Sequence, residues 1–263
     1  MNKQNNLLVQ FLETIGGFCL SRFHDFGTIV LLYTQTLHEL FFGRRRLRHI
    51  VQQMSHLGVD SLTIVLLTLL FTGVVFTLQT ASEFIRFGAQ SAVGGIISIA
   101  IGRELGPVLV GVVCAGRVGA AITAEISTMK VTEQIDALRV MAVNPVNYLI
   151  VPRMVACMLV VPLLTVFGDV IGVLGGYVVA VYYSGITPYI FIDSIKTFVE
   201  VYDLTGGLAK AVFFGNVIAV LGCYYGLTCQ GDAQGVGVAT TKTVVTSIIV
   251  IFILNALLTF IIY

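Results

Sequence analysis

Residues 102–153 read GRELGPVLVGVVCAGRVGAAITAEISTMKVTEQIDALRVMAVNPVNYLIVPR, and this stretch carries charges inside a strongly apolar sequence. Arg103 and Glu104 stand in an apolar run that continues to about Gly116, and Arg117 follows it. A charge at the centre of a membrane span costs about 2.5 to 3.5 kcal/mol on insertion scales, so charged residues there usually have a function. Arg103 and Glu104 would point about 100° apart on a helix, which predicts a separate partner on another span for each.

The second half of this stretch is amphipathic. Polar residues recur at helical spacing over residues 125–141, and an apolar stripe accompanies them at Val131, Ile135, Leu138 and Ala142. The pattern predicts a short helix at about residues 120–142, lying along a membrane surface between two spans. Such a helix can receive movement from a separate ATPase, or it can be an ordinary amphipathic connector. The residues alone leave both interpretations open.

The composition of the chain indicates an integral membrane protein. Of its 263 residues 57% are hydrophobic and 11% are charged, and the mean hydropathy is +0.95, far more apolar than a soluble domain. The net charge is +1 and no long basic block occurs, which argues against nucleic acid as a partner. The five cysteines form no CxxC pair and the four histidines show no metal-ligand spacing, so no metal site is predicted.

The chain before the first span predicts amino-terminal interfacial helices over residues 7–50. An apolar run at residues 7–20 is broken by Gly16-Gly17, and a second apolar face follows from Thr28. The residues of this face are Ile29, Leu32, Tyr33, Thr36, Leu37, Leu40 and Phe41. The run RRRLR at residues 44–48 predicts that this side of the membrane is the cytoplasm.

Hydropathy predicts five spans in one all-α transmembrane region over residues 60–263, within a single domain over 1–263. The spans lie at about 60–78, 92–116, 154–183, 207–228 and 243–263. Glycines at 168, 172 and 176 predict close packing of the third span. A polar turn over 79–90 and a loop with a helix at 188–202 are expected outside. The odd number of spans and the lack of an internal repeat argue against the common secondary-transporter plans.

Several motifs resemble those of the MlaE/YrbE permease family, the membrane subunits of MCE-associated ABC lipid transporters. The motifs are RELGP at 103–107, AGR-GAA-TAEI at 115–126 and EQIDAL-VMAVNP at 133–145. The segments HLGVDSLTIVLLTLLFTGVVFTLQ and GVGVATTKTVVTS resemble the first span and the last cytoplasmic turn of the family. The resemblance extends from about Phe26 to the end of the chain.

The resemblance implies a homodimeric permease that works with other proteins. Two ATPase subunits would bind ATP and magnesium, an MCE-domain protein would lie on the outer side, and a STAS-domain protein often accompanies them. The implied cargo is a glycerophospholipid, moved between the bacterial cytoplasmic membrane, or the plastid inner envelope, and another envelope layer. This chain itself has no GxxxxGK[ST] motif and is expected to hold no nucleotide or cofactor.

The resemblance also implies roles for individual residues. Residues 125–141 would form the coupling helix that contacts the ATPase, with charges at Glu125, Lys130, Glu133, Asp136 and Arg139. The lipid cavity would carry polar residues at Arg103, Glu104, Lys210 and Asn255. The apolar residues that flank them in the sequence are expected to form its walls, at Val108, Leu109, Phe213 and Phe214. Asn255 would occupy a position that is acidic in many relatives.

Two other functions are weighed against transport. An intramembrane enzyme acting on lipids could use Glu104, Asp169 or Lys210 as acid or base, but no nucleophile with an adjacent base occurs at helical spacing. A structural scaffold would leave the charges in the spans without a task. For each charge, a purely structural ion pair is the alternative to a contact with substrate, and for Asp169 the structural role is favoured.

Overall fold

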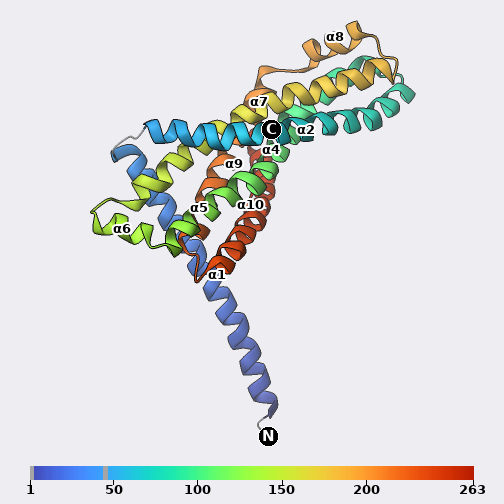
Figure 1. Cartoon of the computed structure of the whole chain (residues 1–263). Coiled ribbons are helices and arrows are strands. Elements are labelled where there is room, and N and C mark those ends of the chain that lie inside the picture. The colour runs from blue at the N-terminus through green and yellow to red at the C-terminus, as the bar shows by residue number, and fades with distance from the viewer. Residues whose placement is uncertain (1–2, 44–46) are drawn as a thin grey trace.

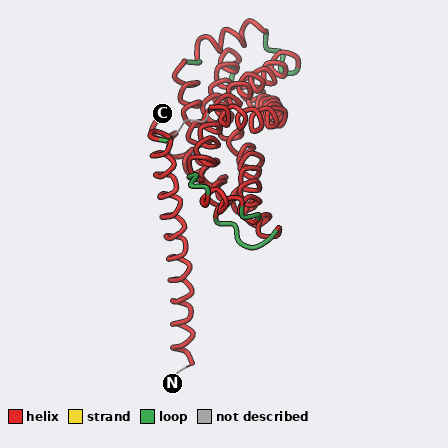
Figure 2. The backbone as a smooth tube through the Cα atoms, turned by 60° about the vertical axis from the view of Figure 1, so that its left-hand side comes forward, coloured by secondary structure: helices red, strands yellow, loops and turns green. Residues whose placement is uncertain are grey.

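The computed structural model describes residues 3–43 and 47–263, which are helical apart from short turns (Figures 1 and 2). The α-helices are α1 (Lys3–Phe42), α2 (Leu47–Arg86), α3 (Val93–Ala100), α4 (Gly106–Cys114), α5 (Ala120–Val131), α6 (Gln134–Val140), α7 (Val151–Tyr182), α8 (Pro188–Phe198), α9 (Val201–Leu227) and α10 (Ala233–Ile262). A 3₁₀ turn (Gln90–Ala92) precedes α3. π-Helical turns join α3 to α4 (Ile101–Leu105) and α4 to α5 (Ala115–Gly119), and another precedes α7 (Val146–Ile150).

Five helical segments of the described chain are long and apolar enough to cross a membrane. They are Leu47–Arg86, Gln90–Val131, Val146–Tyr182, Val201–Leu227 and Ala233–Ile262. The chain is therefore an all-α integral membrane protein, as predicted. Each segment is longer than its predicted span, because helical hydrogen bonding continues past the apolar residues that hydropathy detects. The outer turn predicted at 79–90 is wrong for residues 79–86, which belong to α2. The second span was predicted to end near Gly116, whereas its helical segment continues to Val131.

The centre of the bundle is the packing of α2 against α7, the most extensive helix contact in the described chain. Gly73 of α2 faces Gly172 of α7 so closely that a Cβ atom on Gly73 would lie 2.0 Å from the Gly172 carbonyl oxygen. Small residues permit this approach of two backbones. The predicted role of the glycine series on α7 is thereby confirmed for Gly168, Gly172 and Gly176, which all face α2.

The amino terminus is a single helix of 40 residues, α1, which Gly16-Gly17 does not interrupt. Its first half extends away from the other helices (Figure 2). Its second half packs against the core through residues of the predicted apolar face, Ile29, Leu32, Tyr33, Leu37 and Leu40. Phe41 departs from the prediction and is 72% exposed. The arginines at 44–46, from which the cytoplasmic side was predicted, lie outside the described residues.

The predicted amphipathic helix over residues 125–141 is two helices. α5 ends at Val131, Glu133 adopts a left-handed backbone with φ 59°, and α6 begins at Gln134. The apolar stripe is divided accordingly: Ile135 is buried, whereas Val131 is 40% exposed. α6 lies at the opposite end of the molecule from α8, which forms the predicted outer helix and stops at Phe198 (Figure 1).

Candidate functional site

The candidate site begins at the π-helical turn Ile101–Leu105, which contains Arg103 and Glu104. Pro107 follows this turn and has no backbone N–H, so the Arg103 carbonyl lacks its i+4 donor. Wide turns of this kind are frequent at functional sites. The turn therefore presents a carbonyl without its i+4 donor and two charged side chains to the neighbouring helices.

Lys210 of α9 satisfies that carbonyl and one carboxylate. Its Nζ donates to the Arg103 carbonyl at 3.0 Å and forms an ion pair with Glu104 Oε1 at 2.6 Å. The Lys210 side chain is 0% exposed, so its positive charge is neutralised within the protein. The close approach of α9 depends on Gly207, where a Cβ atom would lie 2.0 Å from the Gly102 carbonyl oxygen.

α10 completes the surroundings of Glu104. The Asn255 side-chain amide donates to Oε2 at 2.9 Å, and the Thr259 hydroxyl donates to Oε1 at 2.9 Å. Lys210 also donates to the Thr259 oxygen at 2.8 Å. The side chains of Glu104 and Arg103 are each 36% exposed, so the site reaches its surroundings through these two groups.

Arg103 has a separate partner, as its position predicts. Its Nε donates to Asp203 Oδ1 at 2.7 Å, and Asp203 also caps the start of α9 by accepting from the Glu200 backbone N–H at 3.0 Å. The Tyr263 ring lies 4.5 Å from the guanidinium and 5.1 Å from Lys210 Nζ, in the range of cation–π contacts. Asp203, Thr259 and Tyr263 were not predicted, although the seven-residue spacing of Asp203 and Lys210 puts both on one face of α9.

The structure thus brings together four of the predicted cavity residues, Arg103, Glu104, Lys210 and Asn255, on three spans. We name these four, with Asp203 and Thr259, the charged cluster. The residues predicted to form the apolar walls differ in their exposure. Phe213 is 50% exposed, Val108 is half-buried beside the core, and Phe214 is fully buried against Gly111, so it faces no cavity of the single chain.

Asp169 of α7 lies outside the charged cluster. Its Oδ1 is buried against Gly106 and has no hydrogen-bond partner among the described residues. Arg117 lies 3.7 Å from Asp60 in a half-exposed pair, away from the charged cluster. No group of three or more His, Cys, Asp or Glu in the described part of the chain could hold a metal ion.

The predicted coupling residues surround α6. Asp136 pairs with Arg139 at 3.0 Å and with Lys130 at 3.6 Å, and Glu125 pairs at 2.8 Å with the buried Arg153 of α7. Glu133 is exposed at the turn and has no ion-pair partner among the described residues. Glu133 is therefore the predicted coupling charge that is free for another protein.

Comparison with known proteins gives one consistent family. Residues 50–261 match the family described as Permease MlaE. The chain is 44% identical over 229 residues to a probable ABC transporter permease protein of Synechocystis, covering 87% of each chain, and 40% identical over 253 residues to one of Rickettsia typhi, covering 95% of this chain and 93% of that one. It is also 37% identical over 231 residues to the chloroplastic protein TRIGALACTOSYLDIACYLGLYCEROL 1 of Arabidopsis thaliana, covering 88% of this chain and 66% of that protein.

Proposed function

The chain belongs to the MlaE permease family of ABC transporters, and we propose that it is the transmembrane subunit of a transporter that moves phospholipid. Transport would run between the bacterial cytoplasmic membrane and an outer envelope layer. A separate ATPase subunit, which binds ATP and magnesium, would supply the energy. Membership of a permease family favours a transport subunit over the intramembrane enzyme that the sequence left open.

The observation that carries the lipid proposal is the charged cluster inside the spans. A buried ion pair is expensive to form and adds little net stability, so a function is a better reason for it than stability. A phospholipid has an anionic phosphate and apolar chains, and the partly exposed guanidinium of Arg103 and the exposed ring of Phe213 offer one contact for each. The name of the Arabidopsis relative contains that of a lipid, which agrees in class with this cargo.

The proposed contact with the ATPase is the exposed surface of α6. Val140 is 88% exposed and Met141 is 63% exposed at the end of α6, and the unpaired Glu133 precedes the start of this helix. Apolar side chains at a membrane protein's water-facing end call for a protein partner. We propose that two copies of the chain assemble with two ATPase subunits, with an MCE-domain protein on the outer side, and with a STAS-domain protein in some assemblies.

The experiment is ATP-driven transfer of phospholipid from vesicles by the purified complex. We expect transfer in the presence of ATP and magnesium, and no ATP hydrolysis by this chain alone. Glu133→Lys should reduce co-purification of the ATPase or the lipid transferred per ATP, while membrane insertion stays intact. Asp193→Lys, the reversal of an exposed acidic residue of α8 that has no ion-pair partner among the described residues, is the matched control and should change neither.

Two results would contradict the proposal. A complex that hydrolyses ATP while phospholipid neither moves nor alters hydrolysis would exclude this cargo. Robust ATPase activity of the single purified chain would exclude a permease that depends on a partner for energy.

A further inference from the structure

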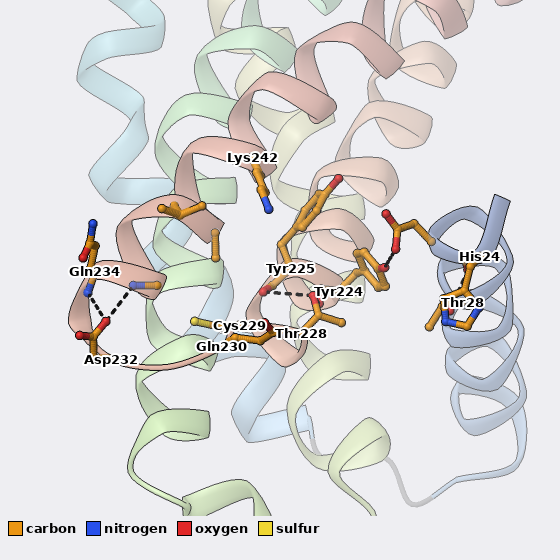
Figure 3. A pocket seen from close by; sticks show the side chains of 14 residues that line it. His24, Thr28, Tyr224, Tyr225, Thr228, Cys229, Gln230, Asp232, Gln234 and Lys242 are labelled. Atoms are coloured by element: carbon orange, nitrogen blue, oxygen red, sulfur yellow. Dashed lines mark hydrogen bonds between the residues drawn. The ribbon is translucent and has the colours of Figure 1, made fainter. Parts of the chain in front are cut away.

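A concave region lies between α1, α9 and α10, where α9 turns into α10. Its polar chamber has a volume of about 600 Å³. His24 and Thr28 line it from α1, Tyr224 and Tyr225 from α9, and Lys242 from α10 (Figure 3). No residue of the charged cluster lines it. The chamber is therefore a separate feature from the candidate transport site.

An apolar groove continues from this chamber along α1, α9 and α10. The groove has a volume of about 450 Å³ and shares Asp25 and Tyr225 with the chamber. Phe26, Ile29 and Val217 are among its walls. Both volumes lie in the range of about 300 to 1,000 Å³ that is typical of small-molecule sites. A polar chamber joined to an apolar groove matches an amphiphile with one charged end.

The charges of the chamber are of both signs. Lys242 has no ion-pair partner in the described part of the chain, and in Figure 3 it extends toward the space between the α1 residues and the α9–α10 turn. Asp25 accepts only one side-chain hydrogen bond there, from the Tyr224 hydroxyl at 3.2 Å. Asp232 is already used, because it caps α10 by accepting from Gln234 N and Gly235 N at 3.1 and 3.4 Å. Among the described residues that line the chamber, Lys242 is thus a cation without an ion-pair partner, and Asp25 is a carboxylate that can accept further hydrogen bonds.

We propose that the joined chamber and groove bind a phospholipid with a zwitterionic, amine-bearing headgroup, taken from the membrane leaflet on the side of α6. Its phosphate pairs with Lys242, its ammonium group pairs with Asp25, and an acyl chain occupies the groove. A purely anionic headgroup would meet the Asp25 and Asp232 carboxylates without an ammonium group to pair with Asp25. This inference goes beyond the proposed function, since a lipid held here does not need to reach Glu104 or Lys210.

The absence of tryptophan from the sequence makes a single-tryptophan reporter possible. Phe26→Trp places the reporter on the groove wall, at a side chain that is 65% exposed. Leu67→Trp, 50% exposed on α2, is the control reporter. The full chain is reconstituted in vesicles of equal parts phosphatidylethanolamine and phosphatidylglycerol, with quenching bromines on the acyl chains of one lipid or of the other.

We expect brominated phosphatidylethanolamine to quench the Phe26→Trp reporter in preference to brominated phosphatidylglycerol. The preference should be about tenfold in relative affinity, the effect of one hydrogen bond to a charged group. The Leu67→Trp reporter should be quenched equally by the two lipids. Equal quenching of Phe26→Trp by both lipids would overturn the proposal.

Two charge variants assign the contacts. Asp25→Asn keeps an acceptor for Tyr224 and should abolish the preference for the amine headgroup. Lys242→Gln should reduce quenching by both lipids to the level of the control reporter. Lys196→Gln on the outer helix α8 should change nothing. A preference that survives both Asp25→Asn and Lys242→Gln would show that the chamber does not select the headgroup. Lipid transfer by the complex is measured separately, so failure here leaves the proposed transport function standing.

Discussion

The ion pair of Lys210 and Glu104 gives the sharpest test of the charged cluster, through the variants Lys210→Met, Glu104→Gln and the two combined. Lys210→Met leaves the Glu104 carboxylate with the donors Asn255 and Thr259 but without a cation. Glu104→Gln leaves the fully buried ammonium with the Arg103 carbonyl and Thr259 but without an anion. The double variant is neutral and keeps similar side-chain lengths.

Breaking a buried pair by removing one partner costs about 3 to 5 kcal/mol. Lys210 is completely buried whereas Glu104 is 36% exposed, so the stranded lysine is the more costly case. We expect about 3 kcal/mol of lost unfolding free energy for Lys210→Met and somewhat more for Glu104→Gln. In the double variant no charge is stranded, so the loss should fall to about 1 kcal/mol, which corresponds to a coupling energy of about 5 kcal/mol between the two residues.

The assay combines equilibrium unfolding in mixed detergent micelles with ATP-driven lipid transfer by the assembled complex. If the charges contact lipid, the double variant regains stability but transfers little lipid. Lys196→Met, on α8 at the opposite end of the molecule from α6, is the control and should match the parent in both measurements.

Two results would refute this reasoning. Strictly additive losses of stability would show that Lys210 and Glu104 are not energetically coupled. Recovery of both stability and transfer in the double variant would show that the pair only holds α9 against the second span, and the charged cluster would then not be a lipid site.

Three further substitutions test the packing. Gly73→Ala should cost about 1 to 3 kcal/mol and lower the thermal unfolding temperature, because its methyl group would overlap the α7 backbone. Glu125→Ala should cost about 3 kcal/mol or more in the same measurement, since it strands the buried guanidinium of Arg153. Glu39→Ala removes the acceptor of Asn144 and Asn147 and should increase proteolysis where α1 meets the segment after α6.

Matched changes distinguish these effects from general damage. Gly116→Ala adds the same methyl group where no atom lies within 4 Å, and it should leave the unfolding temperature unchanged. If Gly116→Ala and Gly73→Ala lower the unfolding temperature equally, close approach of α2 and α7 is not the cause.

Part of the charged cluster could be predicted from the sequence, because charged residues are rare in apolar runs and are easily recognised there. Arg103 and Glu104 were identified in this way, and separate partners for them were predicted from their angular separation, whereas Lys210 and Asn255 were assigned to the site through the family resemblance. That both partners lie on α9, at Asp203 and Lys210, was not predicted, because single-sequence periodicity gives the face of a helix but not its neighbour. Asp203 was also missed because the fourth span was predicted to begin after it.

The break between α5 and α6 shows a different limit. The spacing of Val131, Ile135 and Leu138 fits one helix, and no glycine or proline interrupts it. The break occurs where Glu133 takes a left-handed backbone, a conformation that costs a residue with a Cβ atom about 1 to 2 kcal/mol. Burial of Ile135 by the returning helix can offset a cost of this size, but that burial is a tertiary contact and leaves no local signal.

Asn255 contacts Glu104 without adding a charge to the cluster. Its amide donates to Glu104 Oε2, while Lys210 occupies Oε1, so one carboxylate is matched by one ammonium group. An ionised aspartate at position 255 would bring a second carboxylate to within hydrogen-bond distance of Glu104 with no second cation there, and one of the two would have to take up a proton. This position therefore requires a hydrogen-bond donor to Glu104. The amide of asparagine is such a donor and does not need to take up a proton from solvent first. A negative charge at position 255 is not needed to hold α10 against the second span.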